Sequence, residues 1–189
     1  YFPVIAEMHR QFAKEYAKML LLNNEYNRTE NFINNHQTTT AEDNFYFTLH
    51  SKLFQLQWEK ADSIYTESEI KNNYPKYESL IDKATHLRYK RKGVAFMMSA
   101  VIPGAGKAYT KDWADAILSF VTVGAFAFQA YRGFSRDGTS SALGWVFGSI
   151  GFGFYIGNVY GSFRGAKLYN QRLDNKIYNE ARLLFDSEY

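Results

Sequence analysis

The chain has 189 residues, of which 46% are hydrophobic and 18% aromatic, and a formal net charge of +3 at pH 7. So small a charge gives little support to nucleic-acid binding, which depends on a concentrated basic surface. The chain contains no cysteine, which excludes disulfide bonds, thiolate metal sites and cysteine nucleophiles. Charged residues dominate residues 1–92 and 164–189, and the middle of the chain is nearly uncharged.

Residues 5–35 are predicted to form two helices. Asn23 and Asn24 separate them, and Tyr26 begins the second. Residues 41–70 repeat the plan, with Trp58 at the start of the second helix of the pair. In the first helix, apolar side chains recur at the three- and four-residue intervals of a helix: Ile5, Met8, Phe12, Tyr16, Met19 and Leu20.

A shift of 32 residues superimposes the two pairs, placing Tyr26 on Trp58 and Ile33 on Tyr65. This period resembles degenerate tetratricopeptide repeats over residues 7–70, although the family's glycine before the aromatic is absent and three repeats are usual. The resemblance implies a protein-binding domain over residues 1–92, closed by a capping helix over 74–92. It also marks Tyr26 and Trp58 as candidate partner-binding residues. A helical bundle without repeats is the alternative, since any two helical hairpins can produce this spacing.

The segment 93–112 is predicted to be interfacial or re-entrant. Residues 93–106 are uncharged but too few to cross a bilayer, and Pro103 with two following glycines breaks any helix. Basic residues and tryptophan are typical of the membrane interface and the anionic head groups. The candidate interface residues are Arg88, Lys90, Arg91, Lys92, Lys107 and Trp113.

Residues 113–165 are predicted to form a transmembrane helical hairpin, because two apolar runs, 116–131 and 140–163, flank a polar link at 133–139. Residues 166–189 are predicted to form an amphipathic helix that folds back on the N-terminal helices, or alternatively lies on the bilayer. The expected fold is therefore all-α: a helical-repeat-like N-terminal bundle, the hairpin and the amphipathic C-terminal helix.

Glycines recur at intervals of four in the second apolar run, which predicts a side-chain-free stripe for helix packing in lipid. Such a stripe closes the hairpin on itself or also docks a partner's helix, and we favour the first interpretation. The predicted helix-packing residues are Gly144, Gly148, Gly153, Gly157, Gly161 and Gly165.

The hairpin and the segment before it carry a Pro-Gly-x-Gly-x-x-Tyr motif, made by Pro103, Gly104, Gly106 and Tyr109. Over residues 93–167 the chain resembles a bacterial envelope family of membrane hairpins, often preceded by tetratricopeptide-like helices. The resemblance implies an accessory role in the cell envelope without catalytic activity.

The residues give no support to an enzyme. Gly104–Lys107 departs from a phosphate-binding loop, because Val101 stands where that loop needs glycine and Ala108 where it needs serine or threonine. The four histidines lie at no metal-ligand spacing. We therefore predict no catalytic residue, metal, cofactor, small-molecule substrate or nucleic-acid partner. Asp112 and Asp115 are expected to flank the N-terminus of an interface helix, where the helix dipole favours negative charge.

The predicted function is a non-catalytic, membrane-anchored adaptor or scaffold subunit of a bacterial envelope complex, in protein secretion or outer-membrane protein assembly. Its expected partners are other envelope membrane proteins and the lipid bilayer. The alternative is a small oligomeric transport or channel subunit. Nine Lys and Arg residues flank the spans against two in the link, which favours cytoplasmic termini. The family resemblance and a Tyr1 start typical of a processed export product favour an inner-membrane protein with a periplasmic helical domain.

Overall fold

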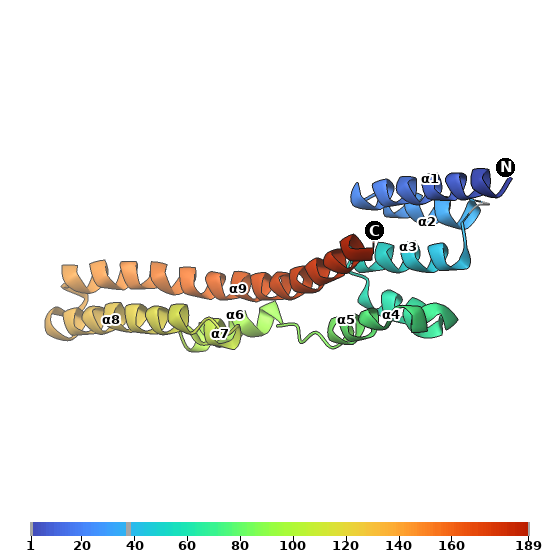
Figure 1. Cartoon of the computed structure of the whole chain (residues 1–189). Helices are drawn as coiled ribbons and strands as arrows, with labels where there is room; N and C mark the ends of the chain where they lie inside the picture. Colours follow the sequence, from blue (N-terminus) through green and yellow to red (C-terminus); the bar gives the residue numbers. More distant parts are fainter. Residues whose placement is uncertain (1, 37–38, 189) are drawn as a thin grey trace. The chain divides into compact units, whose positions relative to one another are not determined.

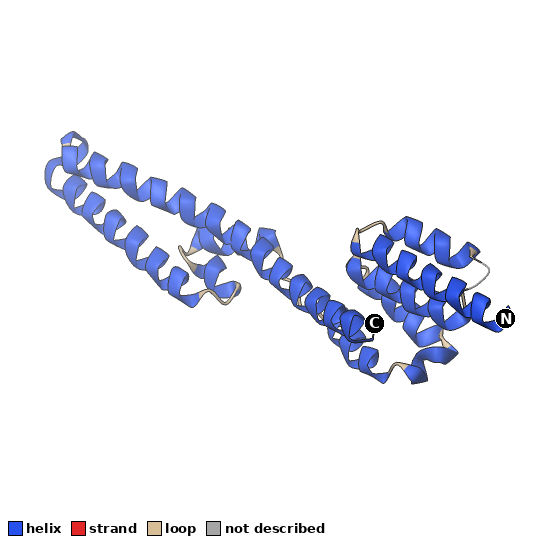
Figure 2. Ribbon diagram, turned by 45° about the horizontal axis from the view of Figure 1, so that its top comes forward, coloured by secondary structure: helices blue, strands red, loops and turns tan. Residues whose placement is uncertain are grey.

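The computed structural model describes residues 2–36 and 39–188, and within them it contains helices and connecting loops but no strand. Figure 1 labels the helices along the chain, and Figure 2 shows the helical content throughout. The all-α prediction is confirmed. The helices are α1 (Phe2–Leu22), α2 (Tyr26–Asn35), α3 (Ala41–Phe54), α4 (Trp58–Glu67), α5 (Pro75–Thr85), α6 (Lys92–Val101), α7 (Ala105–Tyr109), α8 (Trp113–Asp137) and α9 (Ala142–Glu188), with short 3₁₀ turns η1 (Glu69–Asn73) and η2 (Gly138–Ser140).

The chain divides into two compact units, which we describe separately. Unit 1 combines the residues up to Leu87 with the stretch from Asp174 onward, and unit 2 comprises Arg88–Leu173. The predicted boundary at residue 92 therefore lies a few residues late. It is late because α5 ends at Thr85 and the basic residues that follow pack within unit 2 rather than continuing a capping helix.

The 32-residue period is visible in the backbone of unit 1. Asn24 and Leu56, which are 32 positions apart, both adopt a left-handed conformation, with φ of 62° and 59°. Each ends the first helix of its pair with the same hydrogen bonds, Glu25 N–H to Leu20 O and Gln57 N–H to Lys52 O. These are the 6→1 bonds of the Schellman motif, which satisfies carbonyl groups that the helix end leaves unpaired. The helical-repeat-like bundle of the prediction is thus formed by α1–α4.

The end of α9 completes the core of unit 1. Ile177, Ala181 and Phe185 are buried there, and the Phe185 ring stacks on Tyr46 with 5.7 Å between centroids. The prediction that the C-terminal helix folds back on the N-terminal helices is confirmed. The amphipathic helix is continuous with the second span, since Ala142–Glu188 contains no proline or other strong stop signal.

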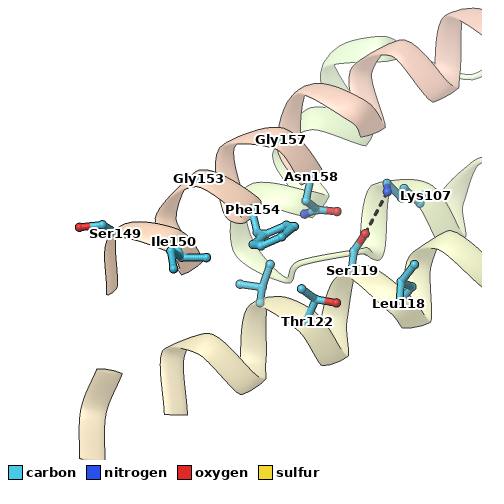
Figure 3. Close-up of a pocket in the computed structure, with 11 residues that line it drawn as sticks. Lys107, Leu118, Ser119, Thr122, Ser149, Ile150, Gly153, Phe154, Gly157 and Asn158 are labelled. Carbon is cyan, nitrogen blue, oxygen red and sulfur yellow. Dashed lines mark hydrogen bonds between the residues drawn. The ribbon is translucent and has the colours of Figure 1, made fainter. Parts of the chain in front are cut away.

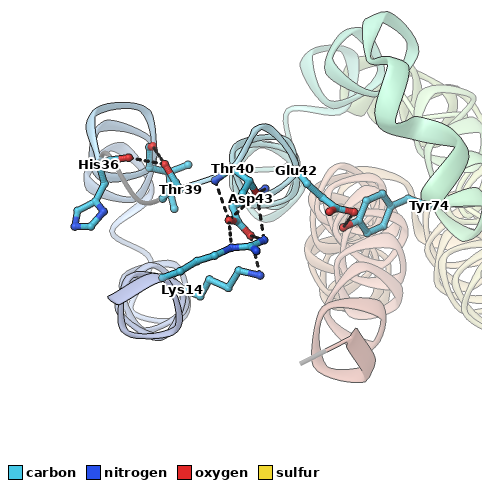
Figure 4. A network of polar contacts seen from close by, with 9 residues as sticks. Lys14, His36, Thr39, Thr40, Glu42, Asp43 and Tyr74 are labelled. Carbon is cyan, nitrogen blue, oxygen red and sulfur yellow. Dashed lines mark hydrogen bonds and ion pairs between the residues drawn. The ribbon is translucent and has the colours of Figure 1, made fainter. Parts of the chain in front are cut away.

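A buried acid links α1 to α3 (Figure 4). Asp43 is only 3% exposed and receives Lys14 Nζ at 2.8 Å and Arg10 Nε at 3.1 Å. It also forms a capping box with Thr40 at the start of α3. Burial alone would raise the pKa of Asp43, but the hydrogen bonds from Lys14, Thr40 and Arg10 outweigh it and lower the pKa to about 2.

Asp43→Asn is expected to destabilise the α1–α3 contact by about 2 kcal/mol at pH 7, because it leaves two cations facing a neutral amide. In the native chain this stability is present above the ordinary pKa of the carboxyl and is lost as the pH falls toward 2. Hydrogen exchange of α1 amides in the full chain measures the effect. Glu59→Gln, an exposed acid in the first turn of α4, is the control and should leave α1 protection unchanged. Equal protection in both variants would contradict the prediction.

Candidate functional site

The Pro-Gly-x-Gly-x-x-Tyr motif forms a tight turn in unit 2 that joins α6 to α7. Ala105 N–H donates to Ile102 O at 3.0 Å, and Gly104 has φ 89° and ψ −19°. Proline second and a left-handed glycine third are the requirements of a type II turn. A Cβ on Gly104 would also lie 2.2 Å from Ala116 O, so the backbone of α8 occupies the space that any side chain would need.

Gly106 lets α7 lie directly on its neighbours. Its N–H donates to Ser99 Oγ of α6 at 2.9 Å, and this hydroxyl lies 2.6 Å from Ser162 Oγ of α9. A Cβ on Gly106 would lie 2.0 Å from Ala95 O and 2.7 Å from both serine side chains. The motif therefore holds α6, α7 and α9 together, which is a structural reason for its glycines.

The predicted interface residues have two kinds of surroundings. Arg88, Arg91, Lys92 and Trp113 are exposed, as interface anchors would be. Lys90 is half-buried: its Nζ lies 4.3 Å from the Tyr109 ring centroid, a cation–π contact, while its backbone N–H donates to Asn170 Oδ1 at 2.8 Å. Tyr109, the last motif residue, also accepts the Arg91 N–H at 3.3 Å.

The two helices of the hairpin are both long and apolar enough to cross a membrane. The polar link predicted at 133–139 is mostly helical, because α8 continues to Asp137 and the chain reverses only at residues 138–141. Within this helical stretch Gly133 lies against Gly144, and a Cβ there would be 2.6 Å from the Gly144 amide nitrogen. Asp112 and Asp115 lie at the N-terminus of α8, as predicted.

The glycines of α9 do not form one stripe, and the prediction that they do is wrong. The step from Gly148 to Gly153 is five residues, which turns the helix by about 140° relative to the preceding glycines. Gly144 and Gly148 face α8, Gly161 and Gly165 lie beside α7, and Gly153 and Gly157 would have nothing within 4 Å of a Cβ. The close contact omitted from the prediction is at Gly151, whose Cβ would lie 2.9 Å from Phe126 Cβ; spacing of 144, 148 and 151 could have revealed it.

Gly153 and Gly157 line a hollow of about 690 Å³ between α8 and α9, open on one side (Figure 3). Phe126 of α8 stacks at 5.2 Å on Phe154, which lines the hollow from α9, and nearer the reversal Phe134 lies 5.4 Å from Trp145. Toward the base of the hairpin the helices separate and Lys107 of α7 lies at one end of the space. Lys107, predicted to face the membrane surface, is thus directed into the hairpin.

The polar end of the hollow contains an unsatisfied amide. Asn158 is 5% exposed, and neither its Nδ2 nor its Oδ1 has a hydrogen-bond partner among the described residues. An unpaired buried polar group costs about 1–3 kcal/mol. Across the hollow, Lys107 Nζ donates to Ser119 Oγ at 2.9 Å and lies 3.7 Å from Asp115 Oδ2. The site thus offers an ammonium, a hydroxyl and an amide beside an apolar surface.

A second candidate surface lies on α1 in unit 1. The face of α1 that packs inward carries Ala13, Ala17, Leu20 and Leu21, whereas a row of other large apolar side chains points outward. Among the exposed large apolar side chains described in unit 1, only Leu56 and Leu183 lie outside this helix. The α1 face comprises Ile5, Met8, Phe12, Tyr16 and Met19, and Phe12 is 68% exposed.

The two predicted partner-binding residues are not on a free surface. Trp58 is 7% exposed and belongs to the core of unit 1, so its prediction as a binding residue is wrong. Tyr26 is half-buried and its hydroxyl donates to Asn24 Oδ1 at 2.6 Å. Burial raises the pKa of Tyr26. Both aromatics begin the second helix of a pair and pack on the core cluster of unit 1.

The residues that the structure describes contain no group of histidines and acids that could hold a metal ion. His50 lies in the core of unit 1, while His86 is exposed on α5's C-terminal side. Comparison with family models, with curated proteins and with solved structures finds no match to the chain.

Proposed function

We propose that the chain is a membrane-anchored adaptor, in which the α8–α9 hairpin lies in a bilayer and the α1 face binds another protein. The observation that carries this proposal is the α1 face itself. Five large apolar side chains at helical spacing lie exposed on one helix of a repeat-like bundle. Contiguous apolar patches of this kind on a folded domain mark protein or membrane interaction sites.

The proposed setting is the bacterial cell envelope, with the chain as an accessory subunit of a protein secretion or outer-membrane assembly complex. The support is the resemblance of the Pro103–Tyr109 motif and the hairpin to envelope proteins. We place the hairpin in the inner membrane and unit 1 on the periplasmic side. The chain lacks cysteine, so a single Glu59→Cys variant treated with a membrane-impermeant maleimide in spheroplasts decides the side of unit 1.

Phe12→Glu is expected to reduce recovery of co-purifying proteins at least about tenfold, because the charge would have to be desolvated at the contact. The full chain is purified from native membranes in mild detergent, and the recovered proteins are quantified by mass spectrometry. Leu183→Glu is the matched control, since Leu183 is equally exposed in unit 1 but isolated on α9. Both variants should have the same melting temperature as the native chain. Equal recovery with Phe12→Glu and Leu183→Glu, or a native chain that purifies alone, would contradict the proposal.

A small oligomeric transport or channel subunit is the second candidate. The observation that favours it is the cluster of polar side chains around the hollow in the hairpin. The described α8 and α9 residues that line it are uncharged, and ion paths through membranes usually carry ionisable groups. Ion flux in liposomes that disappears with Gly157→Leu would place this function above the adaptor.

A further inference from the structure

The hollow in the hairpin has a polar end and an apolar length. At the polar end, Lys107 and Asn158 approach from α7 and α9, and Ser119 lies opposite on α8 (Figure 3). Ser119 Oγ already accepts from Lys107, so its own proton is free to donate. The ammonium of Lys107 keeps further protons after this bond, and the amide of Asn158 keeps both.

Donors outnumber acceptors among Lys107, Ser119 and Asn158, and Lys107 is the one charged residue among the described residues that line the hollow. Asp115 forms an ion pair with Lys107, with 3.7 Å between Oδ2 and Nζ, but its side chain is 58% exposed and does not line the hollow. Lys107, in contrast, is 19% exposed. The groups that face into the hollow therefore suit an anionic oxygen, which would accept from the ammonium, the hydroxyl and the amide together.

The rest of the hollow suits a hydrocarbon chain. Its lining is mostly apolar, and Gly153 and Gly157 leave the α9 surface open. The apolar side chains are Leu118, Val123, Ile150 and Phe154, and two hydroxyl residues, Thr122 and Ser149, accompany them. From Asn158 to Ser149 the hollow follows nine residues of helix, about 13 Å along the axis. It runs from the base of the hairpin, where α7 and the N-terminus of α8 lie, toward the reversal. A lipid in a bilayer has the same arrangement, with its head at the surface and its chain inward.

We propose that this hollow binds one anionic phospholipid, with its phosphate at Lys107, Ser119 and Asn158 and an acyl chain between α8 and α9. The proposal rests on the hairpin lying in a bilayer, as proposed above, but not on any protein bound at α1. It gives the Asn158 amide a partner and fills the space beside the two open glycines.

A second copy of the chain is a poorer occupant. α9 carries no charged residue from its start at Ala142 to Phe163, so this part of a second copy would bring no anion to Lys107. Packing through Gly153 and Gly157 would bring at most neutral groups, such as a second Asn158 amide, to this end of the hollow. Charge complementarity therefore favours the lipid.

The test is native mass spectrometry of the full chain, delipidated in a neutral detergent and titrated with palmitoyl-oleoyl phosphatidylglycerol. The expected result is one retained lipid per chain. Lys107→Met and Gly157→Leu should each weaken binding about tenfold or more, by removing the charge-assisted hydrogen bond and by filling the hollow, respectively. Lys92→Met and Gly124→Leu are the matched controls, because Lys92 does not line the hollow and a Cβ on Gly124 meets nothing within 4 Å. Both controls should retain the lipid.

Three results would overturn the proposal. Retention that is equal in all four variants would show annular lipid without a site. Inorganic phosphate that displaces the phosphatidylglycerol at equal concentration would show a site for the free anion. A dimer that Gly157→Leu converts to a monomer, with lipid retention unchanged, would assign the hollow to a second copy. None of these results depends on whether Phe12→Glu loses a partner, so the two proposals fail separately.

Discussion

Gly106→Ala is expected to lower the free energy of unfolding of unit 2 by about 3 kcal/mol, at the upper end of overpacking effects. The added methyl group would lie 2.0 Å from the Ala95 carbonyl oxygen, a backbone atom that cannot rotate away. Moving α7 outward would then break the Gly106 N–H bond to Ser99 and separate Ser99 from Ser162. Hydrogen exchange of the α6 and α7 amides, in the full chain in mild detergent, measures this loss of stability.

Gly93→Ala is the matched control, because it also replaces a helical glycine of unit 2 by alanine. A Cβ on Gly93 meets nothing within 4 Å. Replacing an unobstructed helical glycine usually stabilises by about 0.5–1 kcal/mol, because alanine loses less backbone entropy on folding. The two variants should therefore change stability in opposite directions. If Gly106→Ala had the same free energy of unfolding as the native chain, the conclusion that the motif holds α6, α7 and α9 together would be wrong.

The sequence identified the helices of unit 1 better than their buried faces. Periodicity at Ile5, Met8 and Phe12 indicates a helix, but it cannot say whether that row meets the core or another molecule. In the structure Ala13 and Ala17 face inward instead. Small residues allow α1 to approach α2 and α3 closely. A prediction based on hydrophobicity alone favours the row of larger side chains as the buried face. The outward row is the surface that we propose binds another protein.

The hairpin shows a second limit. Gly153 and Gly157 have the same four-residue spacing as Gly144 and Gly148, so interval counting groups them together. Only the cumulative rotation of the helix separates the two sets, and only the position of α7 shows that Lys107 enters the hollow. Lys107, Ser119 and Asn158 lie on three different helices, α7, α8 and α9, and α7 is positioned by the Pro103–Gly106 turn. Such a site depends on tertiary contacts, which spacing along one helix does not encode.

Acidification from pH 6.5 to pH 4 is expected to destabilise unit 1 by up to about 3 kcal/mol through one residue, His50. His50 is fully buried, and burial lowers its pKa from 6.5 to about 4. Its Nδ1 lies 2.9 Å from Tyr46 O, an acceptor, so Nδ1 carries the proton. Nε2 then accepts the hydroxyl of Tyr77 at 3.1 Å, and the neutral ring is satisfied on both sides.

Protonation would place a charge among aromatic rings and require the Tyr77 hydroxyl to change from donor to acceptor toward Nε2–H. The unfolded chain binds this proton near pH 6.5 and the folded chain only near pH 4, so stability falls as the pH falls between these values. The window lies above the one for Asp43, whose pKa is about 2, and the two effects are separable.

Chemical unfolding of the full chain at several pH values, monitored by hydrogen exchange in α3 and α5, should show this slope. His50→Gln removes the titrating group and should flatten the slope, even though its stability at pH 7 is lower. His86→Gln, at an exposed histidine near Asp82, should keep the native slope. A native slope in His50→Gln would mean that another group titrates in this range. If the stability of the native chain did not change between pH 6.5 and pH 4, the buried His50 ring would bind its proton without destabilising the core.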